Sequence, residues 1–292
     1  MKKIIYLSLF LVLLTAQSVY SQCSDAGVCT IGRHQPGESG NKTSHIYFGF
    51  SLGSSGKDAD INGNLNDLSY SQFRLEGEFD LKNNFRVNLS IPFLFISGPL
   101  GTSSGQGDAE IIFSKMFTVK KKHKLTFFAG GKLATGKINT KDSLPQRYMP
   151  GLGTHDIIVG AQYSVTNYFF GIGYQKPFGR SENYLTRLKR GDDVFIRAGF
   201  FETFNKVNVK AEILTIIRIQ PSSVLASYTP ETFTEISNSN EPQVNLAATA
   251  GYMLSDELTL SVQAAIPFLK RDYNYDGLKR TFSIGVNLGY GF

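Results

Sequence analysis

The sequence of 292 residues contains no tryptophan, only four histidines and only two cysteines. After Leu14 it has no apolar run approaching the roughly 20 residues that a transmembrane helix needs. The net formal charge of +6 is mild, and no basic patch is interleaved with aromatic residues. These absences exclude helical membrane spans after the amino terminus and give no indication of a nucleic-acid surface.

Aromatic residues and glycine are abundant instead. Phe, Tyr and Trp together make up 13% of the chain, all of it Phe and Tyr, and there are 29 glycines. Membrane β-barrels place aromatic side chains in girdles at both membrane interfaces and small residues on crowded inner faces. The composition therefore favours a β-barrel over an ordinary soluble domain.

The segment Thr281–Phe292 shows this pattern most clearly. Its apolar residues recur with a period of two, which indicates a β-strand with one apolar face. One face carries Phe282, Ile284, Val286, Leu288, Tyr290 and Phe292, and the other carries Ser283, Gly285, Asn287, Gly289 and Gly291. The inner face of this strand is thus expected to be small and uncharged.

The same alternation occurs in eleven further segments, each about as long as a tilted membrane strand. We therefore predict an all-β fold, an antiparallel transmembrane β-barrel of about 12 strands. A soluble barrel or sandwich is the alternative, but the polar faces carry more Gly, Ser, Asn and Gln than a solvated surface would. The segments are His45–Gly53, Gln72–Leu81, Phe85–Phe95, Asp108–Val119, Lys124–Thr135, Asp156–Val165, Tyr168–Phe178, Asp193–Thr203, Val207–Gln220, Gln243–Leu254 and Leu258–Phe268.

The connections between these segments alternate in length. Short ones, such as Lys82-Asn83-Asn84, carry the Asn, Asp and Lys residues that suit tight hairpins. The long ones include residues 54–67, 97–107 and 221–242. Short periplasmic turns and long extracellular loops are the outer-membrane arrangement, and an even strand number places both ends of the barrel on the periplasmic side.

The amino-terminal region divides into two parts. Lys2, Lys3 and a short apolar stretch predict a signal peptide over residues 1–21, whose removal leaves a net charge of +4. A lipoprotein signal acylated at Cys23 is the alternative. Residues 22–43 form a periplasmic segment, either a cap or plug at the barrel mouth or a mobile tail, and residues 44–292 form the barrel.

Cys23 and Cys29 fall in this segment. Export leads to an oxidising compartment, so a disulfide is expected. A metal site that adds Asp25 and His34 would have an incomplete ligand set. We predict no metal and no cofactor.

The charged residues expected to face the lumen are candidates for ion or solute selectivity. Asp80 is predicted to lie opposite Arg86. These charges either pair across the lumen and fill it, or form a transverse field that orients a solute. Since the last strand has no inner charge, selectivity is expected from a wall opposite it, around Arg74 to Arg86. The candidates are Arg74, Glu76, Glu78, Asp80, Arg86, Asp108, Glu110, Lys132, Arg197, Lys210, Glu212 and Arg218.

Two other features allow weaker interpretations. His155 lies beside Asp156 at the expected extracellular rim, and Ser143 precedes it, but no nucleophile motif surrounds that serine. The chain is therefore not expected to be an enzyme. The tract Arg187–Arg190 either pairs with lipopolysaccharide phosphates or is a solvated loop.

Short motifs extend these expectations. Gly107-Asp108, Gly131–Gly136 and Ile91-Pro92-Phe93 resemble elements of the outer-membrane channel proteins named after the meta-pathway of phenol degradation, with Ala134 in place of that family's proline. The resemblance implies a channel for small molecules, with lumen roles for Asp108 and Lys132. The terminal strand is similar to the closing strand of bacterial outer-membrane barrels, which implies that Phe292 is read by the barrel-assembly machinery.

The predicted function is thus an outer-membrane channel for passive diffusion of an unidentified small solute, exported by its signal peptide to the outer membrane of a Gram-negative bacterium. Outer-membrane lipid and lipopolysaccharide are the expected surroundings. A non-conducting structural or surface-binding barrel is the alternative, and a lipid-modifying enzyme around His155 is a weaker one.

Overall fold

The computed structural model describes residues 44–59, 62–139, 144–270, 275–276 and 282–292. The predicted signal peptide, the segment 22–43 and both cysteines lie outside the described residues, so the predictions for them stay untested.

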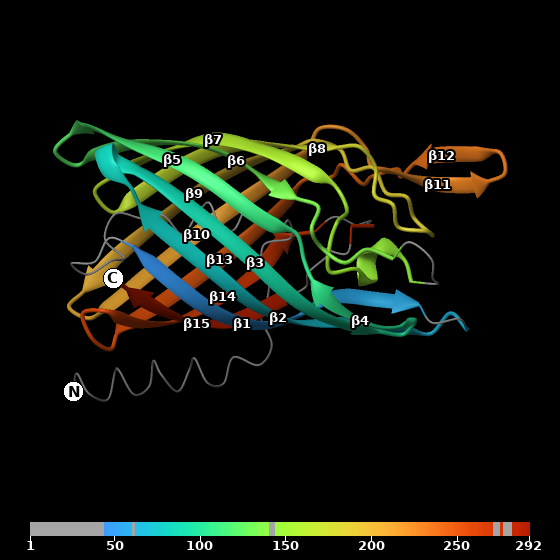
Figure 1. Cartoon of the computed structure of the whole chain (residues 1–292), viewed down its shortest axis with the longest axis horizontal. Helices are drawn as coiled ribbons and strands as arrows, with labels where there is room; N and C mark the ends of the chain where they lie inside the picture. Colours follow the sequence, from blue (N-terminus) through green and yellow to red (C-terminus); the bar gives the residue numbers. More distant parts are fainter. Residues whose placement is uncertain (1–43, 60–61, 140–143, 271–274, 277–281) are drawn as a thin grey trace.

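The described chain is built almost entirely from β-strands (Figure 1). Its two short 3₁₀ turns are η2 (Lys82–Asn84) and η3 (Gln146–Tyr148). The strands are β1 (His45–Ala59), β2 (Leu65–Asp80), β3 (Phe85–Gly98), β4 (Gly101–Gln106), β5 (Ala109–Lys120), β6 (His123–Leu133), β7 (His155–Val165), β8 (Tyr168–Phe178), β9 (Asp193–Phe204), β10 (Val207–Arg218), β11 (Ser223–Tyr228), β12 (Glu231–Glu235), β13 (Gln243–Met253), β14 (Leu258–Leu269) and β15 (Phe282–Gly291).

The main sheet closes on itself into a 12-strand antiparallel barrel. Closure follows from the pairing of β1 with β15 and from the further pairing of β2 with β3. Strands β4 and β5 share one position in the wall, because both pair with β3, β4 along its carboxyl half and β5 along its amino half. The predicted fold class and strand number are confirmed.

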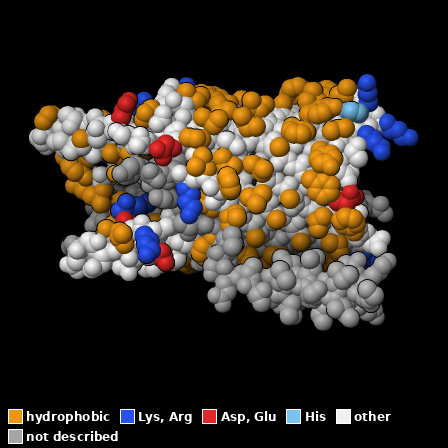
Figure 2. Space-filling model, turned by 180° about the vertical axis from the view of Figure 1, so that it is seen from behind, with side chains coloured by type: hydrophobic (Ala, Val, Ile, Leu, Met, Phe, Trp, Pro, Cys, Tyr) orange, Lys and Arg blue, Asp and Glu red, His pale blue; other side chains and the backbone are white. Residues whose placement is uncertain are grey.

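The outer surface of the barrel is apolar. Figure 2 shows a broad band of hydrophobic side chains over the wall, with most charged side chains near its two ends. Outward residues such as Phe73, Phe113 and Phe170 each expose half or more of their surface. A soluble barrel would bury this face, so that alternative is wrong. Among the described residues, no helix is both long and apolar enough to cross a membrane.

The two ends of the barrel differ, and we call them the turn end and the loop end. At the turn end, Asn83, Asn84, Thr166 and Asn205 take positive φ values between 52° and 62°, the left-handed conformation that asparagine tolerates best after glycine. Phe292 also lies there, paired with Ser44. At the loop end, the β11–β12 hairpin extends beyond the barrel (Figure 1).

Three predicted loops contain strands instead. The segment 54–67 continues the β1–β2 hairpin, 97–107 contains β4, and 221–242 contains β11 and β12. The extended part of β1 is rich in Gly and Ser and lacks alternation, but Asp58 pairs in register with Asn66 across the hairpin. Backbone pairing extends these strands although their residues do not alternate between apolar and polar, so the hydrophobic pattern did not predict them.

The barrel interior holds two apolar clusters. One consists of buried inward residues from β5, β6, β7, β9 and β10, namely Ile112, Phe128, Ile158, Phe195, Leu214 and Ile216. The second lies toward the loop end, where β2 and β3 meet the loop containing η3, and consists of Leu68, Tyr70, Leu94, Ile96, Tyr148 and Met149. The clusters fill parts of the lumen and confine any passage to the rest of it.

Candidate functional site

The charged inner face of β2 lies near the turn end. Arg74 Nη1 is 3.0 Å from Glu76 Oε1 on the same strand. Asp80 lies opposite Arg86 in register, as predicted, and Arg86 Nη2 donates to Asp80 Oδ2 at 3.0 Å while its Nε donates to Oδ1. Glu78 is 3.9 Å from Arg86. This group carries three carboxylates and two guanidinium groups.

A second charged group lies on β9 and β10. Arg197 forms an ion pair with Glu212, and Lys210 Nζ is 3.4 Å from the same carboxylate. Both cations also lie near the ring of Phe169, at 5.3 Å for Arg197 and 5.5 Å for Lys210. The Arg197 stem packs over Gly171, where a Cβ would come within 2.9 Å of it. Two cations therefore share one carboxylate here.

The ion pairs in these two charged groups run along the barrel wall, either within one strand or between neighbouring strands. Arg74 pairs within its own strand, Arg86 with the neighbouring strand, and Arg197 likewise. Neighbouring strands lie about 4.8 Å apart, which brings such partners within reach without crossing the lumen. The interpretation that the strand charges also pair across the lumen stays a prediction.

The relation between β2 and β15 differs from the prediction. Only β1 separates them in the sheet, so the Arg74–Arg86 wall adjoins the uncharged face of β15. Six positions separate β2 from β9, and half of a 12-strand barrel is six positions. The acid-rich face of β2 therefore faces the cation-rich pair of β9 and β10. This opposition follows from the number and the order of the strands around the wall.

A buried network of charged residues lies on the loop-end side of the first apolar cluster. Lys132 is fully buried, and its Nζ is 3.0 Å from Asp156 Oδ2. The same oxygen receives hydrogen bonds from Arg190 and Gln175, and Glu110 lies opposite Lys132 in register. The network joins β6, β7, β8 and the loop that carries Arg190, and removal of one charged partner would leave an uncompensated buried charge.

The basic tract at residues 187–190 is partly inside this network. Arg190 is 3% exposed and bound to Asp156, whereas Arg187 pairs with Glu231 on β12 at 3.3 Å. Neither of its expected roles, a phosphate-binding surface or a fully solvated loop, describes Arg190. The burial of Arg190 could not be predicted from a short run of charged residues in the sequence.

Arg218 connects several segments at the loop end through hydrogen bonds and ion pairs. Its Nε and Nη2 donate to both oxygens of Asp193 at 3.0 and 2.9 Å, and Nη2 also donates to Asp276 Oδ2 at 3.0 Å. Nη1 donates to Ser222 at 3.1 Å. Asp276 follows β14, so this guanidinium joins two adjacent strands to a loop from elsewhere in the barrel.

The loop between β6 and β7 is fastened over the loop end. Asp108 accepts hydrogen bonds from the backbone N–H groups of Gly136 at 3.0 Å and Leu152 at 2.7 Å. The Tyr148 hydroxyl donates to Asp58 at 3.0 Å and accepts from the Leu100 N–H at 3.1 Å, and Arg147 is 2.7 Å from Asp58. Burial raises the pKa of the Tyr148 hydroxyl, which favours the protonated form that donates to Asp58.

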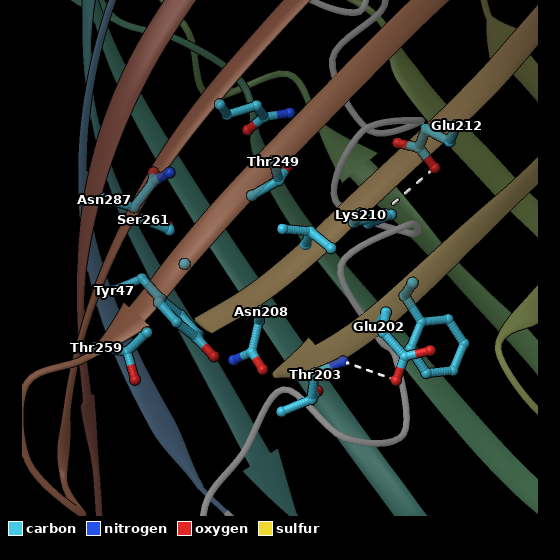
Figure 3. A pocket seen from close by; sticks show the side chains of 14 residues that line it. Tyr47, Glu202, Thr203, Asn208, Lys210, Glu212, Thr249, Thr259, Ser261 and Asn287 are labelled. Atoms are coloured by element: carbon cyan, nitrogen blue, oxygen red, sulfur yellow. Dashed lines mark hydrogen bonds and ion pairs between the residues drawn. The ribbon is translucent and has the colours of Figure 1, made fainter. Parts of the chain in front are cut away.

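A chamber lies in the turn-end half of the lumen (Figure 3). The volume open to the centres of water molecules within it is about 70 Å³, which holds roughly five waters. Charged Lys210, Glu212 and Glu202 contribute to it, together with the ring of Phe201. Its other polar side chains are uncharged and come from β1, β9, β10, β13, β14 and β15, namely Tyr47, Thr203, Asn208, Thr249, Thr259, Ser261, Gln263 and Asn287. Sequence reasoning missed this chamber because it concentrated on charge.

The geometry of the described residues does not support a catalytic site around His155 or a metal site. His155 is exposed at the loop end, and its Nδ1 accepts from the Ala134 N–H at 3.3 Å. Ser143 lies outside the described residues. Within the described ranges, no group of three or more His, Cys, Asp or Glu side chains is placed to hold a metal ion.

No protein-family model and no curated protein sequence matches the chain. Its fold, however, is similar to that of a crystal structure of an outer-membrane channel from Pseudomonas putida F1, with a TM-score of 0.61 at 12% identity over 89% of this chain and 100% of that chain. The KdgM porin in complex with disordered oligogalacturonate gives a TM-score of 0.47 at 9% identity, covering 85% of this chain and 99% of that one. A mutant of the TodX monoaromatic hydrocarbon channel gives 0.46 at 11% identity, covering 88% and 91%.

The first of these similarities shows the fold. The chain has the architecture of Gram-negative outer-membrane barrels, and the expected likeness to outer-membrane channel proteins is confirmed at that level. At such low identity, the function must be argued from the geometry of the lumen.

Proposed function

We propose that this protein is an outer-membrane channel for the passive diffusion of small solutes. The observation that carries the proposal is the chamber in the lumen of a closed barrel, lined by polar side chains and reached from the turn end. A barrel that served only as a scaffold would gain stability from filling this space, because close packing of side chains is favourable.

The orientation follows from the outer-membrane arrangement. Short turns face the periplasm and long loops face the outside in such barrels. The apolar band then contacts outer-membrane lipid, and the loop-end charges meet lipopolysaccharide. Phe292 acts as the signal for the assembly machinery, and export uses the signal peptide at residues 1–21. The protein has no enzymatic activity in this proposal.

Conductance in a planar bilayer tests the channel. Purified protein should give discrete current steps, and these should respond to changes in the chamber. In Thr249→Cys the new thiol lies in the chamber, so a charged thiol reagent should alter the current. Ala248→Cys is the matched control, because the adjacent side chain faces outward. Wild-type protein with the same reagent corrects for Cys23 and Cys29.

A bilayer that stays closed at all voltages would contradict the channel. Equal responses of the two cysteine variants would show that the current does not pass through the chamber.

A non-conducting barrel that binds a surface partner remains the second candidate, and one observation favours it. The β11–β12 hairpin and the adjoining loop expose Tyr184, Tyr228 and Phe233 beyond the barrel. Tyr184 and Tyr228 pack with ring centroids 5.3 Å apart, and Arg180 lies 3.7 Å from the centre of the Phe233 ring. Deleting residues 224–234 should leave conductance unchanged if the channel is the function.

A further inference from the structure

The chamber has a lining whose chemistry points to a class of solute. We propose that it binds a neutral, polyhydroxylated small molecule of about monosaccharide size. This inference rests on the proposed channel function and adds the substrate class to it.

The uncharged polar groups form the first part of the argument. Asn208, Thr249, Ser261 and Asn287 come from four strands and point into one space (Figure 3). Amide groups both donate and accept hydrogen bonds, as do hydroxyl groups. Such a lining matches a solute that has hydroxyl groups on several sides. An apolar solute would displace water from these groups without replacing its hydrogen bonds, which is costly.

Asn208 shows that this capacity is not fully used within the protein. Its Oδ1 is buried, and no hydrogen-bond partner for it exists in the structure as described. The side chain belongs to the lining of the chamber. A buried acceptor of this kind is satisfied by a bound hydroxyl donor.

Aromatic rings form the second part. The Tyr47 ring lies against the wall over Gly289, where a Cβ would stand 2.6 Å from the ring. The glycine thus leaves room for one edge of the ring beside the wall, and the ring contributes to the lining of the chamber. Phe201 contributes a second ring from β9. Polar groups combined with aromatic surfaces are typical of small-molecule sites, and a sugar offers both hydroxyl groups and an apolar face.

Charge balance indicates that the solute is neutral. Lys210 is 3.4 Å from Glu212, which also pairs with Arg197. Glu202 accepts hydrogen bonds from Asn167 and from the Thr203 N–H. Each charged side chain that lines the chamber therefore already has a partner. An ionic solute would have to compete with these contacts, whereas a neutral one would not.

Equilibrium binding to the full-length protein in detergent tests the proposal without requiring conduction. The probes are D-glucose, D-glucuronate and D-glucosamine, which share a ring and differ in charge. Glucose should bind most tightly. Asn208→Leu combined with Thr249→Val removes two polar groups at similar volume and should weaken glucose binding about tenfold. Ala248→Val on the outer face is the matched control and should leave binding unchanged.

Tighter binding of glucuronate or glucosamine than of glucose would overturn the neutral class. Equal glucose affinity in the double variant and the wild type, or no glucose binding to folded wild-type protein, would overturn the site. Heat-modifiable gel mobility verifies that each variant is folded. The two proposals can fail separately. A protein that conducts but does not bind glucose would contradict only the binding site. A protein that binds glucose but never conducts would contradict only the channel.

Discussion

Phe128 and Phe195 lie nearly parallel inside the barrel, with ring centroids 6.4 Å apart and planes inclined by 14°. They belong to β6 and β9, which are separated in the wall by β7 and β8. The rings meet because a glycine on each intervening strand leaves room, with Phe128 over Gly160 and Phe195 over Gly173. The first apolar cluster thus depends on glycines as well as on large side chains.

Substituting these glycines should destabilise the barrel. In Gly160→Ala or Gly173→Ala the added methyl group would overlap a phenylalanine ring, and overpacking of this kind costs about 2 kcal/mol. Urea unfolding of the protein in lipid vesicles measures the change. Gly251→Ala is the control, because its Cβ would have no atom nearer than 3.7 Å. Equal stability of all three variants would show that the rings have space to move.

Charge changes in the chamber should alter ion preference in opposite directions. Glu212→Gln removes a lumen carboxylate and should shift the reversal potential in a salt gradient toward anion preference, whereas Lys210→Gln should shift it toward cations. Lys115→Gln is the control, since Lys115 lies outside the lumen, 4.1 Å from the centre of the Phe85 ring. Shifts of the same sign in both lumen variants would contradict a conducting chamber.

Loss of one hydroxyl group should loosen the loop between β6 and β7. In Tyr148→Phe, Asp58 loses a donor and the Leu100 N–H loses its acceptor, which should cost about 1–2 kcal/mol of local stability. Hydrogen exchange at Leu100 should accelerate accordingly. Tyr228→Phe removes a hydroxyl that donates to the Tyr184 carbonyl in another loop, and exchange at Leu100 should be unaffected there. Unchanged exchange in Tyr148→Phe would argue against the fastening role.

The predicted disulfide is open to a direct chemical test. If Cys23 and Cys29 are bonded, alkylation of the exported protein should label no cysteine before reduction and two after it. A Cys23→Ser variant should then expose Cys29 to labelling without reductant. Labelling of both cysteines in unreduced wild-type protein would exclude the bond.

Much of the barrel could be predicted from the sequence, because inward and outward residues alternate on a strand whose outer face meets lipid. The same pattern set the register of Asp80 against Arg86. It could not reveal the apolar clusters, since an inward Phe128 beside an outward Phe127 reads as a break in alternation. Such doublets, also present at Ile111-Ile112 and Ile157-Ile158, are the signal that would have indicated an apolar inner face.

The partners of the charged residues in the barrel wall were harder to predict from the sequence than the strands themselves. Sequence places Arg74 and Arg197 on inner faces, and the predicted strand order places their strands half a barrel apart, but it does not show which side chains pair. Loop contacts such as Arg190 with Asp156 depend on chain folding over the barrel mouth. The candidate residues were therefore found more reliably than their partners.

The seam between β1 and β15 is the wall pairing with the largest entropic cost of closure. Its register joins His45 to Gly291 and Ser54 to Phe282, residues from opposite ends of the described chain. The other wall contacts form between strands closer in sequence, so the loop-closure entropy of this seam is the largest in the wall. Until β1 and β15 pair, each is an unpaired edge strand whose backbone groups can pair with another chain. Mispairing before closure is therefore expected mainly at these two strands.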